Sequence, residues 1–237
     1  MNPLLLAATL LLSAPTPSVA RDTPPIPAST PTKVRTPTKV RTPSPHPTMK
    51  VGEHVPLGEA RFDVGEATFM RTSLGAMAHQ SHKQLKVAVH PDAFIWIMDI
   101  DQAIKFWNAT ANREVFVLLD EFPTKREGIT SDVVLVFVAP DETINLVLGG
   151  VVPEGVQAAA TRMSVNDTTG ELTNTLVLFP TRRFEASAEA TARHEFGHVL
   201  GLDHDINENS LMAAWSGGLG ILSFTDFMAI RVTYGQE

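Results

Sequence analysis

The chain has 237 residues, which is enough for one sizeable domain or two small ones. Its formal net charge is −7, and it contains no cysteine. The lack of cysteine excludes disulfides, a lipid-modified cysteine and cysteine ligands to a metal, so a folded domain must depend on its core and on any bound metal.

The first 20 residues predict a secretory signal peptide. Residues 4–12 form an apolar run that is too short to span a membrane, and small residues follow at positions 18–20. No Lys or Arg precedes the run, which is unusual for such a peptide. Because no other long apolar run follows, we expect a secreted protein without a transmembrane span.

Residues 21–50 predict a disordered linker. They are rich in Pro and Thr and contain the repeat PTKVRT twice in tandem, a composition that cannot bury a core. The segment has a net charge of +5, and subtracting this from the chain total of −7 leaves −12 for residues 51–237, since residues 1–20 are uncharged. An acidic domain argues against nucleic-acid binding. The linker is either a solvated spacer or a basic tether to an anionic surface or to the domain itself.

Residues 51–237 show the patterns of one folded domain. A strand is predicted at residues 85–90, which alternate apolar and other side chains until Pro91 ends them. A helix follows at residues 97–109, where apolar side chains recur at helical spacing. Residues 132–139 are almost continuously apolar, which is typical of a strand buried on both faces. The other predicted elements are strands within 61–70, at 157–163 and at 172–179, loops at 149–153 and 166–170, and helices at 185–200 and from 222 onwards.

The sequence HEFGHVLGLDH, which begins at His194, is the most informative stretch of the chain. His194 and His198 are four residues apart, so a helix places both imidazoles on one face. Gly201 lets the chain leave the helix with a positive φ and bring back His204 as a third ligand. Three protein ligands and one open position are typical of a catalytic zinc, where Glu195 would accept the proton of a metal-bound water.

A methionine, Met212, follows the third histidine after eight residues. The long histidine motif together with this methionine resembles the metzincins, and the closing segment resembles that of secreted bacterial matrixins. The resemblance implies that Met212 lies under the metal in a Met-turn, the alternative being plain core packing. It implies that Asp226 ties the last helix to this turn, the alternative being a capping box with Ser223. Asp205 is implied to support the site, although typical matrixins have Ser at this position.

The resemblance covers residues 85–237 and implies an α+β metzincin-like fold. This fold has a twisted, mostly parallel sheet with an antiparallel edge strand, and about three helices that include the metal-bearing helix and a C-terminal helix. The implied activity is that of a secreted zinc endopeptidase with one catalytic zinc and Glu195 as general base. Protein or peptide substrates would pair with the edge strand at residues 157–163, and we expect a monomer.

Two further expectations concern the substrate pocket and calcium. Trp215 either shapes a pocket for an apolar residue just after the cleaved bond or packs in the core. Metzincins often hold calcium in loops, and four acidic residues are candidates for binding it, with solvated turns as the alternative: Asp141, Glu142, Asp167 and Glu171.

Two other functions stay open at this point. One is a non-catalytic, zinc-containing binding or adhesion module. The other is a narrow-specificity metallohydrolase that acts on cell-wall or self peptides. The presence of Glu195 favours an enzyme, because a domain that has lost catalysis often loses this base as well.

Overall fold

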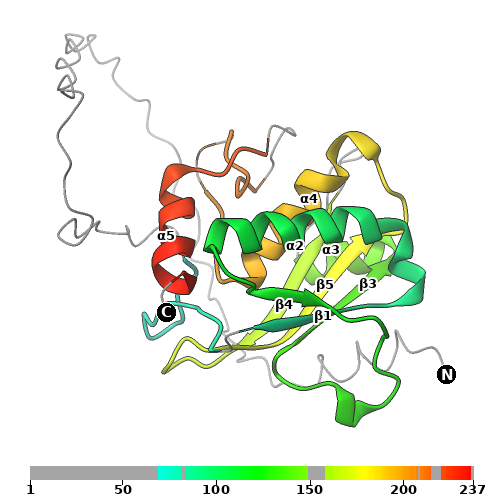
Figure 1. The fold of residues 1–237 in the computed structure, drawn as a ribbon, viewed down its shortest axis with the longest axis horizontal. Helices are drawn as coiled ribbons and strands as arrows, with labels where there is room; N and C mark the ends of the chain where they lie inside the picture. Colours follow the sequence, from blue (N-terminus) through cyan, green and yellow to red (C-terminus); the bar gives the residue numbers. More distant parts are fainter. Residues whose placement is uncertain are drawn as a thin grey trace, which may run out of the picture. The chain divides into compact units, whose positions relative to one another are not determined.

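The computed structural model describes residues 69–81, 84–148, 158–205, 207, 209–214 and 220–235. Five strands in this part of the chain form one sheet in the order β2-β1-β3-β5-β4 (Figure 1). Four of them pair in parallel, and β4 runs antiparallel to β5 at one edge. This confirms the predicted sheet. The strands are β1 (Leu85–Val89), β2 (Phe116–Leu118), β3 (Val133–Ala139), β4 (Ala160–Val165) and β5 (Leu172–Pro180).

Four α-helices lie within the described residues. Three of them correspond to the helices that the sequence predicts, and α3 is additional, because the acidic residues at its start were candidates for a calcium-binding loop or a solvated turn. None of the described helices is long and apolar enough to cross a membrane. The helices are α2 (Ile97–Ala111), α3 (Asp141–Leu148), α4 (Glu185–Val199) and α5 (Phe224–Tyr234), and two short 3-10 helices are η1 (Pro91–Trp96) and η2 (Arg126–Gly128).

The sequence patterns of the central strands agree with their burial. All seven residues of β3 are buried, because β3 has a strand on each side and its two faces are both covered. In β1, four of five residues are buried. Its last residue is followed directly by η1, whose first residue is Pro91, as the sequence predicts.

The edge strand differs from its predicted bounds. The sequence analysis placed it at residues 157–163, whereas β4 covers Ala160–Val165. Pairing with β5 continues beyond Met163 because a register shift between Arg162 and Ser164 absorbs one irregular residue. Gln157 lies outside the described residues, as do the predicted signal peptide, the predicted linker, residues 61–68 of the predicted strand pattern and the predicted loop at 149–153.

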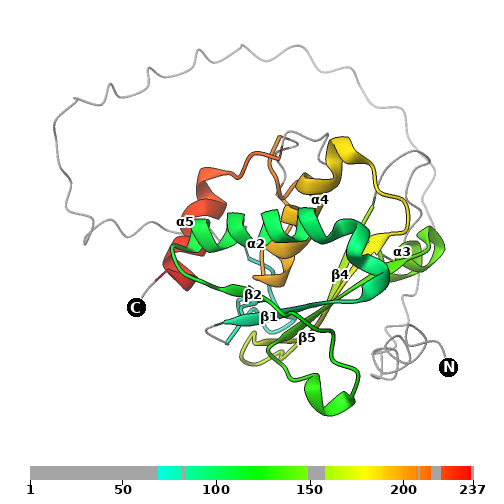
Figure 2. The same cartoon turned by 45° about the vertical axis from the view of Figure 1, so that its right-hand side comes forward.

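Helices α2 and α4 pack against each other and lie on the same side of the sheet (Figures 1 and 2). Nε1 of Trp107 on α2 donates to the carbonyl of Arg193 on α4 over 2.8 Å. Near the start of α4, Arg183 donates two hydrogen bonds of 2.6 and 3.0 Å to the buried carboxylate of Asp99. These contacts fix α4, which carries the histidine motif, relative to α2.

Candidate metal centre

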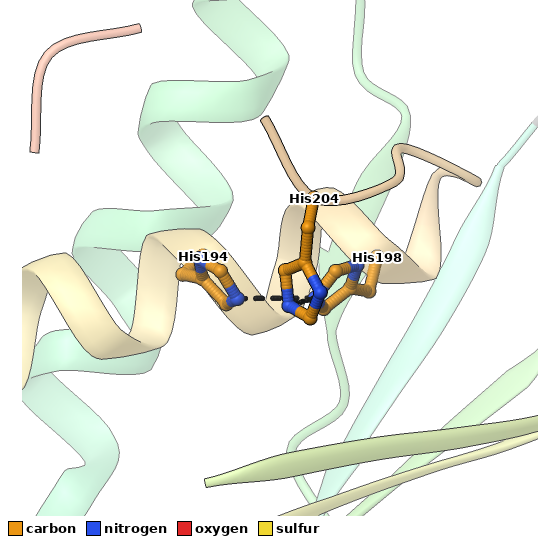
Figure 3. Close-up of side chains that lie close together, drawn as sticks. All are labelled: His194, His198 and His204. Atoms are coloured by element: carbon orange, nitrogen blue, oxygen red, sulfur yellow. Dashed lines mark hydrogen bonds between the residues drawn. The ribbon is translucent and has the colours of Figure 1, made fainter. Parts of the chain in front are cut away.

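Three histidines converge at the end of α4. His194 and His198 lie one helical turn apart, and His204 returns from the segment after the helix (Figure 3). Nε2 of His198 lies 3.0 Å from Nε2 of His194 and 3.2 Å from Nε2 of His204. Ligands at about 2.0–2.1 Å from a tetrahedral zinc lie about 3.3–3.4 Å apart. The two distances from His198 are close to this value, and the three nitrogens all lie within 4.8 Å of one another, so the group could hold one zinc ion.

Backbone carbonyls orient two of the imidazoles. Nδ1 of His194 donates to the carbonyl of Leu211 over 2.8 Å, and Nδ1 of His198 donates to the carbonyl of Leu202 over 2.7 Å. With the proton on Nδ1, each ring presents the lone pair of Nε2 to the centre. Burial lowers the pKa of all three imidazoles, and that of His198 to about 3. The rings are thus neutral, which is the form that binds a metal.

Gly201 makes the turn that brings His204 back to the other two histidines. Its φ is +95°, a conformation that L side chains rarely adopt. A Cβ at this position would lie 2.5 Å from the carbonyl oxygen of Ala78. Both the backbone angle and the close approach of the 69–81 segment therefore require glycine, as the motif predicts for the first of these reasons.

Glu195 lies on α4 beside this centre and is buried, with 5 % of its surface exposed. Oγ1 of Thr161 on β4 donates to its carboxylate oxygen Oε2 over 2.7 Å. Burial raises the pKa of Glu195 to about 7, against the lowering effects of the Thr161 hydrogen bond and the charge of His204. Thr161 was not identified from the sequence, because its proximity depends on the pairing register of the edge strand.

The segment around Met212, which the resemblance identifies as a Met-turn, contacts both α4 and the residue after His204. Met212 is fully buried, and the preceding carbonyl, of Leu211, is the one that His194 contacts. The backbone N–H of Asp205 donates to the carbonyl of Met212 over 2.8 Å, which joins the segment to the residue after the third histidine. A Cβ on Gly197 would lie 2.5 Å from Sδ of Met212. Gly197 occupies a variable position of the motif, so the sequence pattern gave no sign of this contact.

Comparison with known proteins agrees with this geometry. The matrixin family model matches residues 57–235, which is more than half of the chain. The chain belongs to the matrixin family. Matrixins are zinc metallopeptidases that act on protein or peptide substrates, and they are typically extracellular. No curated protein matches the chain closely enough to count as a relative.

In this matrixin, Asp226 lies in the first turn of the last helix and near the segment that contains Met212. Oγ of Ser223 accepts a hydrogen bond from the backbone N–H of Asp226 over 3.1 Å, so Ser223 caps α5. Burial and the nearby charge of Asp205 together raise the pKa of Asp226 to about 6, against the lowering effects of hydrogen bonds with Ser223 and Ser210. Oγ of Ser210 also accepts from the backbone N–H of Met212. Capping and contact with the Met-turn therefore occur together.

The C-terminal end of the matrixin's motif helix is capped by distant segments. Nε2 of Gln80 donates to the carbonyl of Val199 over 2.8 Å, and the hydroxyl of Tyr234 donates to the carbonyl of Leu200 over 2.6 Å. The same hydroxyl accepts from the backbone N–H of Gln80 over 3.1 Å. Carbonyls at a helix end lack partners within the helix, so these bonds satisfy them just before the turn at Gly201.

Among the described residues, the acidic candidates for calcium binding do not extend this centre. Trp215 lies outside the described residues. Asp141 and Glu142 are in the first turn of α3, and Glu171 accepts a hydrogen bond from Ser81. Within the described ranges, the group of His, Asp and Glu side chains that could hold a metal is the histidine triad alone. The structure therefore does not support the calcium expectation.

Proposed function

We propose that residues 51–237 form the catalytic domain of a secreted zinc endopeptidase, preceded by a signal peptide and a basic linker. The observation that carries this proposal is the convergence of three neutral imidazoles beside the buried carboxylate of Glu195, with Nε2 of His198 lying 3.0 and 3.2 Å from the Nε2 atoms of the other two. His204 is exposed, whereas His194 and His198 are half-buried. The centre therefore has a side open to solvent, where a substrate can approach.

His194, His198 and His204 would hold the zinc. When bound, the zinc supplies Lewis acidity that activates a water and polarises the carbonyl of the substrate. Glu195 would accept the proton of the attacking water and return it to the leaving amine. Burial raises its pKa to about 7. A group whose pKa lies near the working pH of the enzyme can both accept and release a proton efficiently.

The edge strand supports a peptide as substrate. Within the described sheet, β4 has a strand neighbour on one side only. An extended peptide can add to such an edge through main-chain hydrogen bonds, which do not depend on sequence. Specificity must then come from side-chain pockets. We propose an apolar residue just after the cleaved bond, with Trp215 as the wall of its pocket.

The test is a cleavage profile of zinc-loaded residues 51–237 on a peptide library, with Glu195→Gln as the matched variant. Wild type should cleave internal peptide bonds. The variant should keep its zinc and its fold but lose on the order of 10²–10⁴ in kcat, which is the usual contribution of a general base. Turnover near that of wild type in zinc-loaded Glu195→Gln would overturn the role of Glu195.

Two variants test the rest of the site. His204→Ala should lose stoichiometric zinc binding and melt at lower temperature, because metal binding adds to the free energy of folding. Trp215→Ala should change the preference just after the cleaved bond, and an unchanged preference would remove Trp215 from the pocket. If wild type cleaves only a narrow set of cell-wall or self peptides, a restricted hydrolase replaces the general endopeptidase. If it binds zinc but cleaves nothing, a binding module replaces both.

A further inference from the structure

One hydroxyl group links the edge strand to the proposed base. Oγ1 of Thr161 lies 2.7 Å from Oε2 of Glu195 and 3.1 Å from the backbone carbonyl oxygen of the same residue. A hydroxyl carries a single proton. Of the two acceptors, the carboxylate oxygen is the nearer one, and hydrogen bonds to its ionised form are the stronger kind. The hydroxyl of Thr161 therefore donates its hydrogen bond mainly to Oε2 of Glu195.

The pairing register of β4 explains why Thr161 faces α4. Thr161 pairs with Val177 of β5 in an antiparallel ladder, and directly opposed residues point to the same face of a sheet. Val177 is fully buried in the core cluster that also contains Phe196 of α4. The side chain of Thr161 is therefore directed toward α4, and the paired strand fixes its backbone.

This arrangement has a consequence for the carboxylate. A Glu side chain has a terminal torsion with broad preferences, so burial alone does not fix the plane of its carboxylate. The bond to Thr161 holds Oε2 toward β4 and so defines the direction of the other oxygen, Oε1. The same strand is the one on which we place the substrate. If Glu195 is held by β4 and the peptide pairs with β4, the same strand fixes the positions of both the base and the substrate.

We propose that Thr161 is a positioning residue that orients the Glu195 carboxylate for proton transfer, a role that rests on the proposed peptidase function. Proton transfer is sensitive to the direction of the acceptor oxygen. The hydroxyl of Thr161 would therefore affect the chemical step and not the binding of zinc or peptide.

The experiment compares Thr161→Val with Thr161→Ser in the zinc-loaded protein. Val has nearly the shape of Thr but lacks the hydroxyl, whereas Ser keeps it. Thr161→Val should lower kcat roughly ten- to a hundred-fold, the worth of a hydrogen bond to a charged group, while KM and zinc stoichiometry stay as in wild type. Thr161→Ser should restore most of kcat. A crystal structure of Thr161→Val should show the Glu195 carboxylate rotated or in two orientations.

Two controls separate positioning from general damage. Thr110→Val on α2 removes another buried hydroxyl, which donates to the carbonyl of Phe106 over 2.9 Å, and it should leave kcat unchanged. In a Glu195→Gln background, Thr161→Val should cause no further loss, because residues that act through one another are not additive.

Each outcome bears on one of the two proposals. Equal kcat in wild type and Thr161→Val, or an equal loss in Thr161→Ser, would overturn the role of Thr161 and leave the peptidase function standing. A further loss in the Glu195→Gln background would also overturn it. A zinc-loaded wild type that cleaves no peptide would overturn the peptidase function, and the role of Thr161 with it.

Discussion

The sulfur of Met212 occupies the space in which a side chain on Gly197 would have to lie. A Cβ on Gly197 would come within 2.5 Å of Sδ of Met212, and within 3.0 Å of Cζ2 of Trp107. Gly197 lies inside α4, where glycine costs about 1 kcal/mol relative to alanine. Glycine nevertheless stands at this position, between His194 and His198, and Met212 packs directly against the helix backbone there.

Gly197→Ala should therefore destabilise the domain, although helix propensity alone predicts a gain of about 1 kcal/mol. Overpacking a filled core typically costs about 1–3 kcal/mol. We therefore expect the steric cost of the new Cβ to exceed the gain in helix propensity. Chemical denaturation of the zinc-loaded protein measures the difference. Adding Met212→Ala should make Gly197→Ala less harmful than it is alone. If Gly197→Ala alone is more stable than wild type, Met212 can move aside at no cost.

Gly201→Ala should cost more than Gly75→Ala, although both residues have a positive φ, +95° and +84°. A left-handed conformation costs a non-glycine residue about 1–2 kcal/mol, and this is the whole expectation for Gly75, which has nothing within 4 Å of its Cβ position. At Gly201 the new Cβ also meets the carbonyl oxygen of Ala78. Zinc affinity should fall only for Gly201→Ala, since only that turn positions His204. Equal losses in both variants would mean that the contact with Ala78 is relieved without cost.

Tyr234→Phe should destabilise the domain by about 1–3 kcal/mol, the cost of leaving a buried hydrogen-bonding group without its partner. The variant removes the only hydroxyl between the backbone N–H of Gln80 and the carbonyl of Leu200. Thermal unfolding with and without zinc measures the effect. We expect zinc binding to weaken as well, because these bonds hold the end of the helix that carries the ligands. Unchanged stability would indicate that water takes the place of the hydroxyl.

The stability advantage of Asp226→Asn over wild type should grow as the pH rises from 4 to 7. Burial raises the pKa of Asp226 to about 6 from the ordinary value of 3.8. A raised folded-state pKa means that the folded state binds the proton more tightly than the unfolded state does. Ionisation therefore penalises folding, progressively between the unfolded and folded pKa values and fully above about pH 6.

The size of this effect is at most about 3 kcal/mol, because each unit of difference between the folded and unfolded pKa values corresponds to about 1.4 kcal/mol. Urea denaturation of both proteins at pH 4 and pH 7 measures it, and the pair should be nearly matched at pH 4. A difference between the two proteins that is the same at both pH values would contradict the raised pKa.

The sequence predicts the candidate zinc ligands because they lie close together along the chain. His194, His198 and His204 follow from helical spacing and one turn, and the apolar run of β3 is visible without knowledge of its neighbours. The sequence does not predict α3. Its first residues, Asp141 and Glu142, are acidic, and acidic residues are favoured both in turns and in the first turn of a helix.

The parts of the site that the sequence does not predict depend on pairing between distant segments. Thr161 reaches Glu195 only through the register of β4 on β5, and a one-residue slip would turn it to the other face. Gln80 belongs to a stretch held by isolated bridges and single hydrogen bonds, so no repeating pattern marks it. Gly197 is recognisable only once the position of Met212 is known.

The capping of α4 by Gln80 and Tyr234 means that the histidine motif cannot be transplanted as a short peptide. The ligands lie within a few turns of chain, but Gln80 and Tyr234, which hold the helix end, are separated by 154 positions. A peptide that carries the motif alone would have to order its own helix and turn on binding, which is unfavourable for so short a helix. We therefore expect high-affinity zinc binding to require the native contacts of Gln80 and Tyr234, and the metal content of a preparation should report how much of the protein has reached its native topology.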